Sequence, residues 1–209
     1  MQMDVSKFDK IAREVFAPAY PLIAAQVVER TGITEGVCLD IGCGGGYLGL
    51  ALAQTTGLFV RFFDQSREML EIVRCNIAAH GLETRTDTLS GDVESIPLPD
   101  GSVNLAVSRG SVFFWDQVQA FQEIYRVLAP GGMSYIGGGF GSAELKAEIN
   151  RKMEARPEDN GQWRERMAKN LGADAPRQFE EALRSAGIPD FEIDNSDDRG
   201  LWVIIRKSP

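Results

Sequence analysis

The stretch Val37-Cys-Leu-Asp-Ile-Gly-Cys-Gly-Gly-Gly-Tyr-Leu-Gly49 decides the fold. Its apolar start predicts a strand over 37–41, and the leucines and alanines after the glycines predict a helix. A strand, a glycine turn and a helix form the first unit of many nucleotide-binding α/β folds. Glycine suits such a turn because it tolerates positive φ and has no Cβ to block a ligand lying against the backbone.

The glycine pattern leaves two classes of ligand open. Gly44-x-Gly46-x-x-Gly49 fits the fingerprint of dinucleotide sites, which place a pyrophosphate at the helix N-terminus. Asp40, however, precedes the first glycine, and a carboxylate there would repel a pyrophosphate. A ligand that carries an amino group would be attracted to it. We therefore favour a cationic or zwitterionic ligand and keep a dinucleotide as the alternative.

A second apolar run, 58–63, predicts the next strand, and Asp64 follows it 18 residues after Gly46. A carboxylate at this place can accept hydrogen bonds from both hydroxyls of a ribose. Both classes of ligand contain a ribose, so Asp64 does not distinguish them. Ser66 is the expected N-cap of the helix that follows.

Two later blocks narrow the choice. They are Gly91-Asp-Val93 with Leu98-Pro-Asp-Gly-Ser102, and Glu123-Ile-Tyr-Arg-Val-Leu-Ala-Pro-Gly-Gly132. Together with the glycine loop, they resemble the motifs of class I S-adenosylmethionine (SAM)-dependent methyltransferases of the small-molecule type, with a methyltransferase domain 11/25-like pattern. The resemblance covers about residues 34–140. It implies SAM as cofactor and S-adenosylhomocysteine (SAH) as product.

The resemblance also implies cofactor contacts, residue by residue. The methionine part of SAM would lie on the glycine loop, the ribose on the acid after the second strand, and the adenine between the next helix and the Gly-Asp turn. Met69 has an alternative role as a core residue, and Asp92 as a turn residue. The implied residues are Asp40, Gly42, Cys43, Gly44, Asp64, Gln65, Met69, Asp92, Val93 and Arg109.

Candidates for the acceptor side follow from position. Residues directly after the fourth predicted strand, 103–108, should lie beneath the transferred methyl group. Arg109 could bind a substrate anion or the SAM carboxylate, or be a surface cation, and Tyr20 and Trp115 are further candidates. The single histidine, His80, is expected to cap a helix end on the surface. The catalytic residues remain unknown, so we expect an acceptor that needs little deprotonation and catalysis mainly by positioning.

The expected fold is α/β, a Rossmann-like doubly wound sheet of seven strands, mostly parallel, with one antiparallel strand near the C-terminus. Residues 1–209 are expected to form a single domain with an N-terminal helical cap, 1–33, and a helical insertion, 142–170. The insertion is charged but has one apolar side, so it is expected to be a lid, with a solvated helical hairpin as the alternative. Gly137, Gly138, Gly139 and Gly141 would act as its hinge or allow close backbone approach to a ligand.

Composition limits the partners. A formal net charge of −8 without a basic run disfavours nucleic acid and anionic membrane surfaces. Three cysteines show no metal-ligand spacing, so no metal is expected. No apolar stretch approaches the ~20 residues of a membrane span, and the cytoplasm is the expected location. An oxidoreductase using a dinucleotide and a non-catalytic SAM-binding module remain the alternatives, and the oligomeric state stays open.

Overall fold

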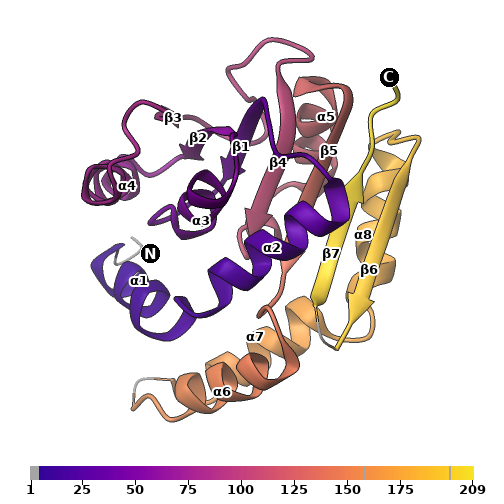
Figure 1. The fold of residues 1–209 in the computed structure, drawn as a ribbon. Helices are drawn as coiled ribbons and strands as arrows, with labels where there is room; N and C mark the ends of the chain where they lie inside the picture. The colour runs from indigo at the N-terminus through magenta and orange to yellow at the C-terminus, as the bar shows by residue number, and fades with distance from the viewer. Residues whose placement is uncertain (1–4, 158, 198) are drawn as a thin grey trace.

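The structure, a computed structural model, describes residues 5–157, 159–197 and 199–209. Within these residues a seven-stranded sheet runs through the centre in the order β3-β2-β1-β4-β5-β7-β6 (Figure 1). The strands β1 to β5 are parallel to one another. β7 pairs antiparallel with both β5 and β6. The predicted sheet with one antiparallel strand is confirmed. The strands are β1 Val37–Ile41, β2 Phe59–Asp64, β3 Thr86–Ser90, β4 Val103–Arg109, β5 Leu128–Gly138, β6 Phe191–Ser196 and β7 Gly200–Ile205.

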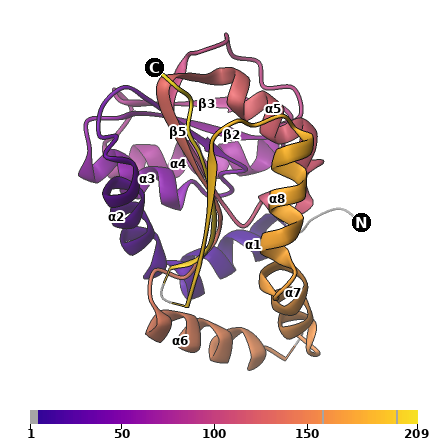
Figure 2. The same ribbon diagram turned by 90° about the vertical axis from the view of Figure 1, so that its right-hand side faces the viewer.

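Helices cover both faces of the sheet. Figure 2 shows α2 and α3 on one side and α5 and α8 on the other, with α6 and α7 beyond one end of the sheet. The elements are α1 Val5–Ile11, the π-helix η1 Ala12–Phe16, α2 Ala19–Thr31, α3 Tyr47–Thr55, α4 Arg67–His80, the 3₁₀ turn η2 Val112–Phe114, α5 Gln117–Val127, α6 Ala143–Glu154, α7 Gln162–Leu171 and α8 Ala175–Ser185.

Two apolar clusters form the core, one on each face. The first joins the sheet to α2, α3, α4, α6 and α7, and the second joins it to α5 and α8. We call these the N-terminal face and the C-terminal face. The inner strands β1, β4 and β7 are mostly apolar because both of their faces are covered.

Side-chain caps explain where several helices begin. Ser66 accepts the Met69 N–H at the start of α4, Asp116 accepts the Val118 N–H at the start of α5, and Ser142 does the same for Leu145 in α6. His80 is exposed at the end of α4, as the sequence predicts.

The glycines at the end of β5 have a packing reason rather than a hinge role. Gly137 and Gly138 lie within β5 and pair with Trp202 and Leu201 of β7. A Cβ at Gly137 would collide with the Leu201 carbonyl oxygen, and one at Gly139 with a neighbouring carbonyl of the chain before β7. The prediction that Gly137 and Gly138 form a hinge is therefore wrong, because their small size lets two backbones approach.

The charged segment after β5 forms the predicted pair of helices, α6 and α7, with a turn between them. No helix among the described residues is both long and apolar enough to cross a membrane.

Candidate active site

The candidate site lies where the parallel strands end. Because β2, β1, β4 and β5 are parallel neighbours, the residues that follow them gather at one edge of the sheet. The glycine loop follows β1, Asp64 ends β2 and Arg109 ends β4. The fold therefore brings together the groups that the sequence places far apart.

The glycine loop is held tightly between two neighbouring segments. Gly42 N–H donates to the Phe63 carbonyl oxygen at 2.8 Å, and Cys43 N–H donates to the same oxygen at 3.2 Å. Gly42 has a φ of +61°, and a Cβ there would collide with the Ser111 hydroxyl oxygen. Both conditions require glycine at this position. The loop is thus fixed before any ligand arrives.

Asp64 connects the loop to β2. Its Oδ2 accepts the Gly44 N–H at 3.0 Å, and its Oδ1 accepts the Ser66 N–H at 2.9 Å. Each carboxylate oxygen can accept a further hydrogen bond, so two ribose hydroxyls can still be bound. Burial raises the pKa of Asp64, and the bonds from Ser66 and Gly44 act in the opposite direction.

Asp40 is more deeply buried than the sequence suggests. Its side chain accepts the Gly49 N–H at 2.9 Å, inside the first turns of α3, and only 2% of the residue is exposed. Burial raises the pKa of Asp40 to about 7, although the bond from Gly49 lowers it and nearby Asp64 raises it. Asp40 therefore first fixes the start of α3 behind the loop. Its direct contact with a ligand remains a prediction.

Two of the predicted adenine residues have the alternative roles that the sequence leaves open. Met69 is 1% exposed and belongs to the core. Asp92 is exposed and accepts the Glu94 N–H at 3.0 Å, as a turn residue does. Val93 is buried and Gln65 is exposed. The contacts of these four residues with adenine remain predictions.

The structure brings two of the three acceptor candidates together. The guanidinium carbon of Arg109 lies 5.7 Å from the centre of the Tyr20 ring and 4.4 Å from that of Phe16. Its Nε donates to the Gly139 carbonyl oxygen at 3.0 Å. Trp115 instead packs against the apolar cluster of the C-terminal face. Tyr20 and Arg109 thus form one group, from which Trp115 is separated by its place on the other cluster.

Sequence reasoning missed a polar pair beside the glycine loop. Tyr47, the residue directly after the glycines, donates its hydroxyl to Asp9 Oδ1 at 2.7 Å. Asp9 is 9% exposed, although its place in an amphipathic N-terminal helix gives no sign of burial. The Tyr47 ring also stacks on Tyr20, with ring centres 5.4 Å apart. Helix α1 therefore lies over the loop.

An aromatic cluster closes the site from the outside. Phe16 of η1 lies 5.9 Å from Trp163 of α7 and 6.4 Å from Phe140, measured between ring centres. Trp163 Nε1 also donates to Asn150 Oδ1 at 2.9 Å and so joins α7 to α6. We call the described residues of the segments 5–20 and 140–171 the cover, because these rings join the two segments above the ends of the strands.

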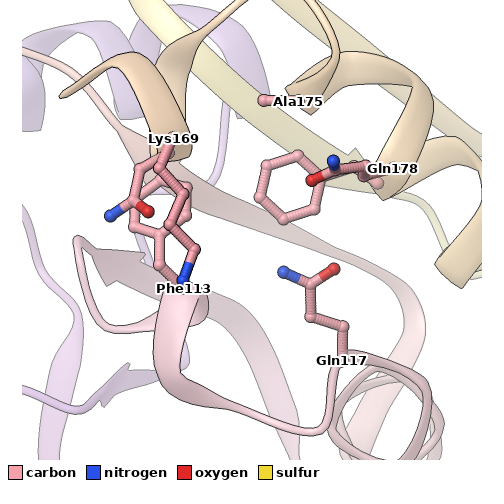
Figure 3. Close-up of a pocket in the computed structure, with 7 residues that line it drawn as sticks. Phe113, Gln117, Lys169, Ala175 and Gln178 are labelled. Atoms are coloured by element: carbon pink, nitrogen blue, oxygen red, sulfur yellow. The ribbon is translucent and has the colours of Figure 1, made fainter. Parts of the chain in front are cut away.

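A separate surface pocket lies on the C-terminal face. Figure 3 shows Phe113, Gln117, Lys169 and Gln178 around it, from η2, α5, α7 and α8. None of the predicted site residues lines it. The cofactor site is therefore better placed at the glycine loop, where the polar groups converge.

Comparison with known proteins identifies the family of this chain. Residues 38–132 match a family described as a methyltransferase domain. The crystal structure of a putative SAM-dependent methyltransferase from Methanococcus maripaludis is 43% identical to this chain. It covers 98% of this chain, 92% of its own chain is matched, and the TM-score is 0.93.

This chain belongs to the SAM-dependent methyltransferases. SAM is therefore its cofactor, and the dinucleotide alternative is wrong. The predicted Rossmann-like methyltransferase fold is confirmed at the same time.

Curated relatives share shorter regions. A Streptomyces halstedii protein named methyltransferase GfsG is 32% identical over 59% of this chain and 45% of its own length. The malonyl-[acyl-carrier protein] O-methyltransferase of Serratia marcescens is 37% identical over 46% of this chain and 35% of its length. The demethylmenaquinone methyltransferase of Thermus thermophilus is 40% identical over 45% and 43%, respectively. This chain spans less than half the length of each of these relatives.

Proposed function

We propose that this methyltransferase moves the methyl group of SAM to a small-molecule acceptor by in-line displacement. The observation that carries the proposal is Asp64, which fixes the glycine loop through Gly44 and retains capacity for two hydroxyl donors. In this arrangement Gly42, Cys43 and Gly44 lie along the methionine part of SAM. The ribose lies on Asp64 beside Gln65, and the adenine lies among Met69, Asp92 and Val93.

The proposed reaction needs few protein groups. The acceptor's electron pair forms a bond to the methyl carbon, the carbon–sulfur bond breaks, and the sulfur keeps the electron pair as neutral SAH. Holding the two reacting atoms about 3–3.5 Å apart can supply much of the rate enhancement. The cover supports this role because its rings pack against one another beside the ends of the strands, and such packing would keep water from the reacting atoms.

The residues near the acceptor side favour a ready nucleophile over an acceptor that needs a base. His80 is exposed at the far end of α4 and does not reach the site. Burial raises the pKa of Tyr20, although the Arg109 charge lowers it, so the phenol stays protonated near neutral pH. The names of the relatives include a quinone and a carrier-linked malonyl group as acceptors, and both support a small or carrier-borne acceptor here.

The test separates an enzyme from a module that only binds SAM. Purified protein is mixed with SAM and a fractionated small-molecule extract of cells, and SAH is measured by mass spectrometry. We expect SAH to form with at least one fraction, and to form far more slowly with Asp64→Ala protein. If SAM binds in calorimetry but no fraction yields SAH above the protein-free rate, the chain is a non-catalytic SAM-binding module.

A further inference from the structure

Arg109 is a partly buried cation without an ionic partner among the described residues. Other arginines of the chain, such as Arg30, Arg61 and Arg126, pair with carboxylates. For Arg109, no carboxylate among the described residues forms an ion pair. Burial lowers the pKa of Arg109, whereas Tyr20 acts in the opposite direction. A desolvated charge without a counter-charge destabilises a folded protein, so its presence points to a partner that binds later.

The surroundings of Arg109 hold its guanidinium in one orientation. Its Nε donates to the Gly139 carbonyl oxygen, and its flat face lies 4.4 Å from the centre of the Phe16 ring. Tyr20 and Phe140 stand on further sides, each 5.7 Å from the guanidinium carbon. Guanidinium carries five N–H donors. The Gly139 carbonyl takes the one on Nε and the Tyr20 hydroxyl is a second hydrogen-bond partner of the side chain, so three N–H donors remain on the terminal nitrogens. The two terminal nitrogens are therefore oriented to bind an anion through two parallel hydrogen bonds.

The position of Arg109 relative to the glycine loop indicates where that anion comes from. The Tyr20 ring stacks on Tyr47, which directly follows the loop, and Arg109 lies within 5.7 Å of the same Tyr20 ring. Arg109 also contacts Phe16 and Phe140, which belong to the cover. A ligand beside Arg109 thus lies next to Tyr20 and beneath the other rings of the cover, on the side where an acceptor would approach.

We propose that Arg109 binds a negatively charged group, a carboxylate or a phosphate, on the methyl acceptor, and that the rings of Phe16, Tyr20 and Phe140 enclose the apolar part beside it. This proposal rests on the proposed function and adds the charge class of the acceptor. Aromatic faces stabilise the guanidinium by cation–π attraction until the anion arrives. The anion then supplies the missing counter-charge, which makes recognition of neutral analogues weak.

The first experiment uses SAH-saturated protein and two probes of similar shape, benzoate and benzamide. Calorimetry compares wild type with Arg109→Met and Arg109→Lys, and with Arg177→Met as a control, since Arg177 is an exposed residue of α8. We expect wild type and the control to bind benzoate at least tenfold more tightly than benzamide. Arg109→Met should lose this preference, and Arg109→Lys should keep only part of it because an ammonium lacks the planar fork.

Folding is checked separately by thermal unfolding of the ligand-free variants. Arg109→Met removes an uncompensated charge and keeps an apolar side chain, so its melting temperature should equal or exceed that of wild type. If wild type shows no preference for benzoate, or if Arg109→Met keeps it, the proposal is wrong. A lowered melting temperature would also count against an unpaired charge at this position.

A second experiment distinguishes the acceptor from the cofactor as the source of the anion. SAM and its decarboxylated analogue are titrated against wild type and Arg109→Met. We expect the ratio of the two dissociation constants to stay the same within twofold in both proteins. If the ratio collapses in Arg109→Met, Arg109 binds the carboxylate of SAM, and the acceptor assignment is overturned. Failure of wild type to bind SAM at all would instead reject the proposed function.

Discussion

Asp40 and Asp64 both lie at the ends of strands that lead into the site, but their carboxylates have different partners. Asp64 accepts hydrogen bonds from the backbone N–H groups of Gly44 and Ser66, at the edge of the sheet where the ligand would bind. Asp40 points away from that edge, to Gly49 in α3. The identities of both acids could be predicted from the sequence as parts of a motif. Their hydrogen-bond partners could not, because these depend on how the loop turns back over the strands.

Asp40 should make stability depend on pH. Its folded pKa of about 7 lies above the ordinary value for aspartate, so the folded state binds more protons between these values. The stabilising contribution is complete below about pH 4 and is lost as the pH rises through 7. In Asp40→Asn the amide oxygen can still accept the Gly49 N–H without titrating. Urea unfolding is measured for both proteins at pH 5 and pH 8. From the lower to the higher pH, the free energy of unfolding of the variant should rise relative to that of wild type, by up to ~1.4 kcal/mol per pH unit below the folded pKa of Asp40. A difference that does not change with pH would show that Asp40 is ionised throughout.

Asp64→Ala should weaken SAM binding by about 1.5–3 kcal/mol, the range for hydrogen bonds to charged groups. The effect has two sources, since the variant loses the ribose partner and the bond that holds Gly44. Calorimetry with SAM and SAH measures it, and Asp174→Ala is the matched control, since Asp174 is an exposed carboxylate directly before α8. Unchanged SAM affinity in Asp64→Ala would remove Asp64 from the cofactor site.

Contacts between distant residues limit what the sequence alone can predict about the site. Tyr20 and Arg109 were both candidates from their positions, yet their proximity depends on α2 packing beside the end of β4. Asp9 could not be recognised as a buried residue from the sequence, because its burial depends on a contact with the distant Tyr47. Trp115 was a reasonable candidate from its position after β4, but the chain turns there towards the C-terminal face.

Among the elements, α6 and α7 pack on the N-terminal helices rather than forming part of the central sheet. Ile149, Met153 and Trp163 bury the apolar side that the sequence showed in this charged segment. Their partners include Phe16 and Phe140, so the two halves of the cover hold each other. The helices were predictable from their periodicity and caps. Their partner surface was not, since part of it comes from Phe16, more than a hundred positions earlier.

The cover should open more readily than the sheet. In ligand-free protein we expect amide exchange across residues 140–170 to be faster than across 37–60, because few elements other than the cover itself hold these helices. SAM together with an acceptor should slow exchange in the cover. Exchange as slow as that of the central strands without ligand would make α6 and α7 a fixed part of the core.

Trp163→Ala tests the same idea by mutation. Removing a buried tryptophan costs about 3–5 kcal/mol where the surroundings cannot collapse. We expect the loss to appear as faster exchange in the cover, with exchange in residues 37–60 unchanged. Trp115→Ala is the matched control, since this half-buried ring lies on the other face. Equal acceleration in both regions would show that the cover and the sheet unfold as one unit.

At the scale of the whole molecule, SAM or SAH should raise the free energy of unfolding, because the ligand binds the folded state and not the unfolded chain. SAM or SAH at about 100 times its dissociation constant should add about 2.7 kcal/mol to the free energy of unfolding. NAD at the same concentration should leave the melting temperature unchanged. A larger rise in the melting temperature with NAD than with SAM would contradict the assignment of SAM as the cofactor.

Most of the architecture was predictable because motifs and apolar periodicity occur together along residues 34–140, which contain five strands, and helices follow β1, β2 and β4. The domain boundaries of the sequence-based description, with a cap over 1–33 and an insertion over 142–170, remain a prediction. The main error was the hinge role predicted for Gly137 and Gly138, which lie in β5. Nothing local in Gly137 or Gly139 shows that their neighbour is the backbone around β7, about sixty residues later.

The place of β7 also determines the order in which the sheet can be built during synthesis. β6 leaves the ribosome before β7, yet β7 lies between β5 and β6 in the finished sheet. Until β7 arrives, β6 has no strand to join, and the open edge of β5 is left without the neighbour that its glycines accommodate. The nascent protein therefore carries an unfinished sheet edge for as long as residues 200–205 are missing, and such edges invite pairing with other chains.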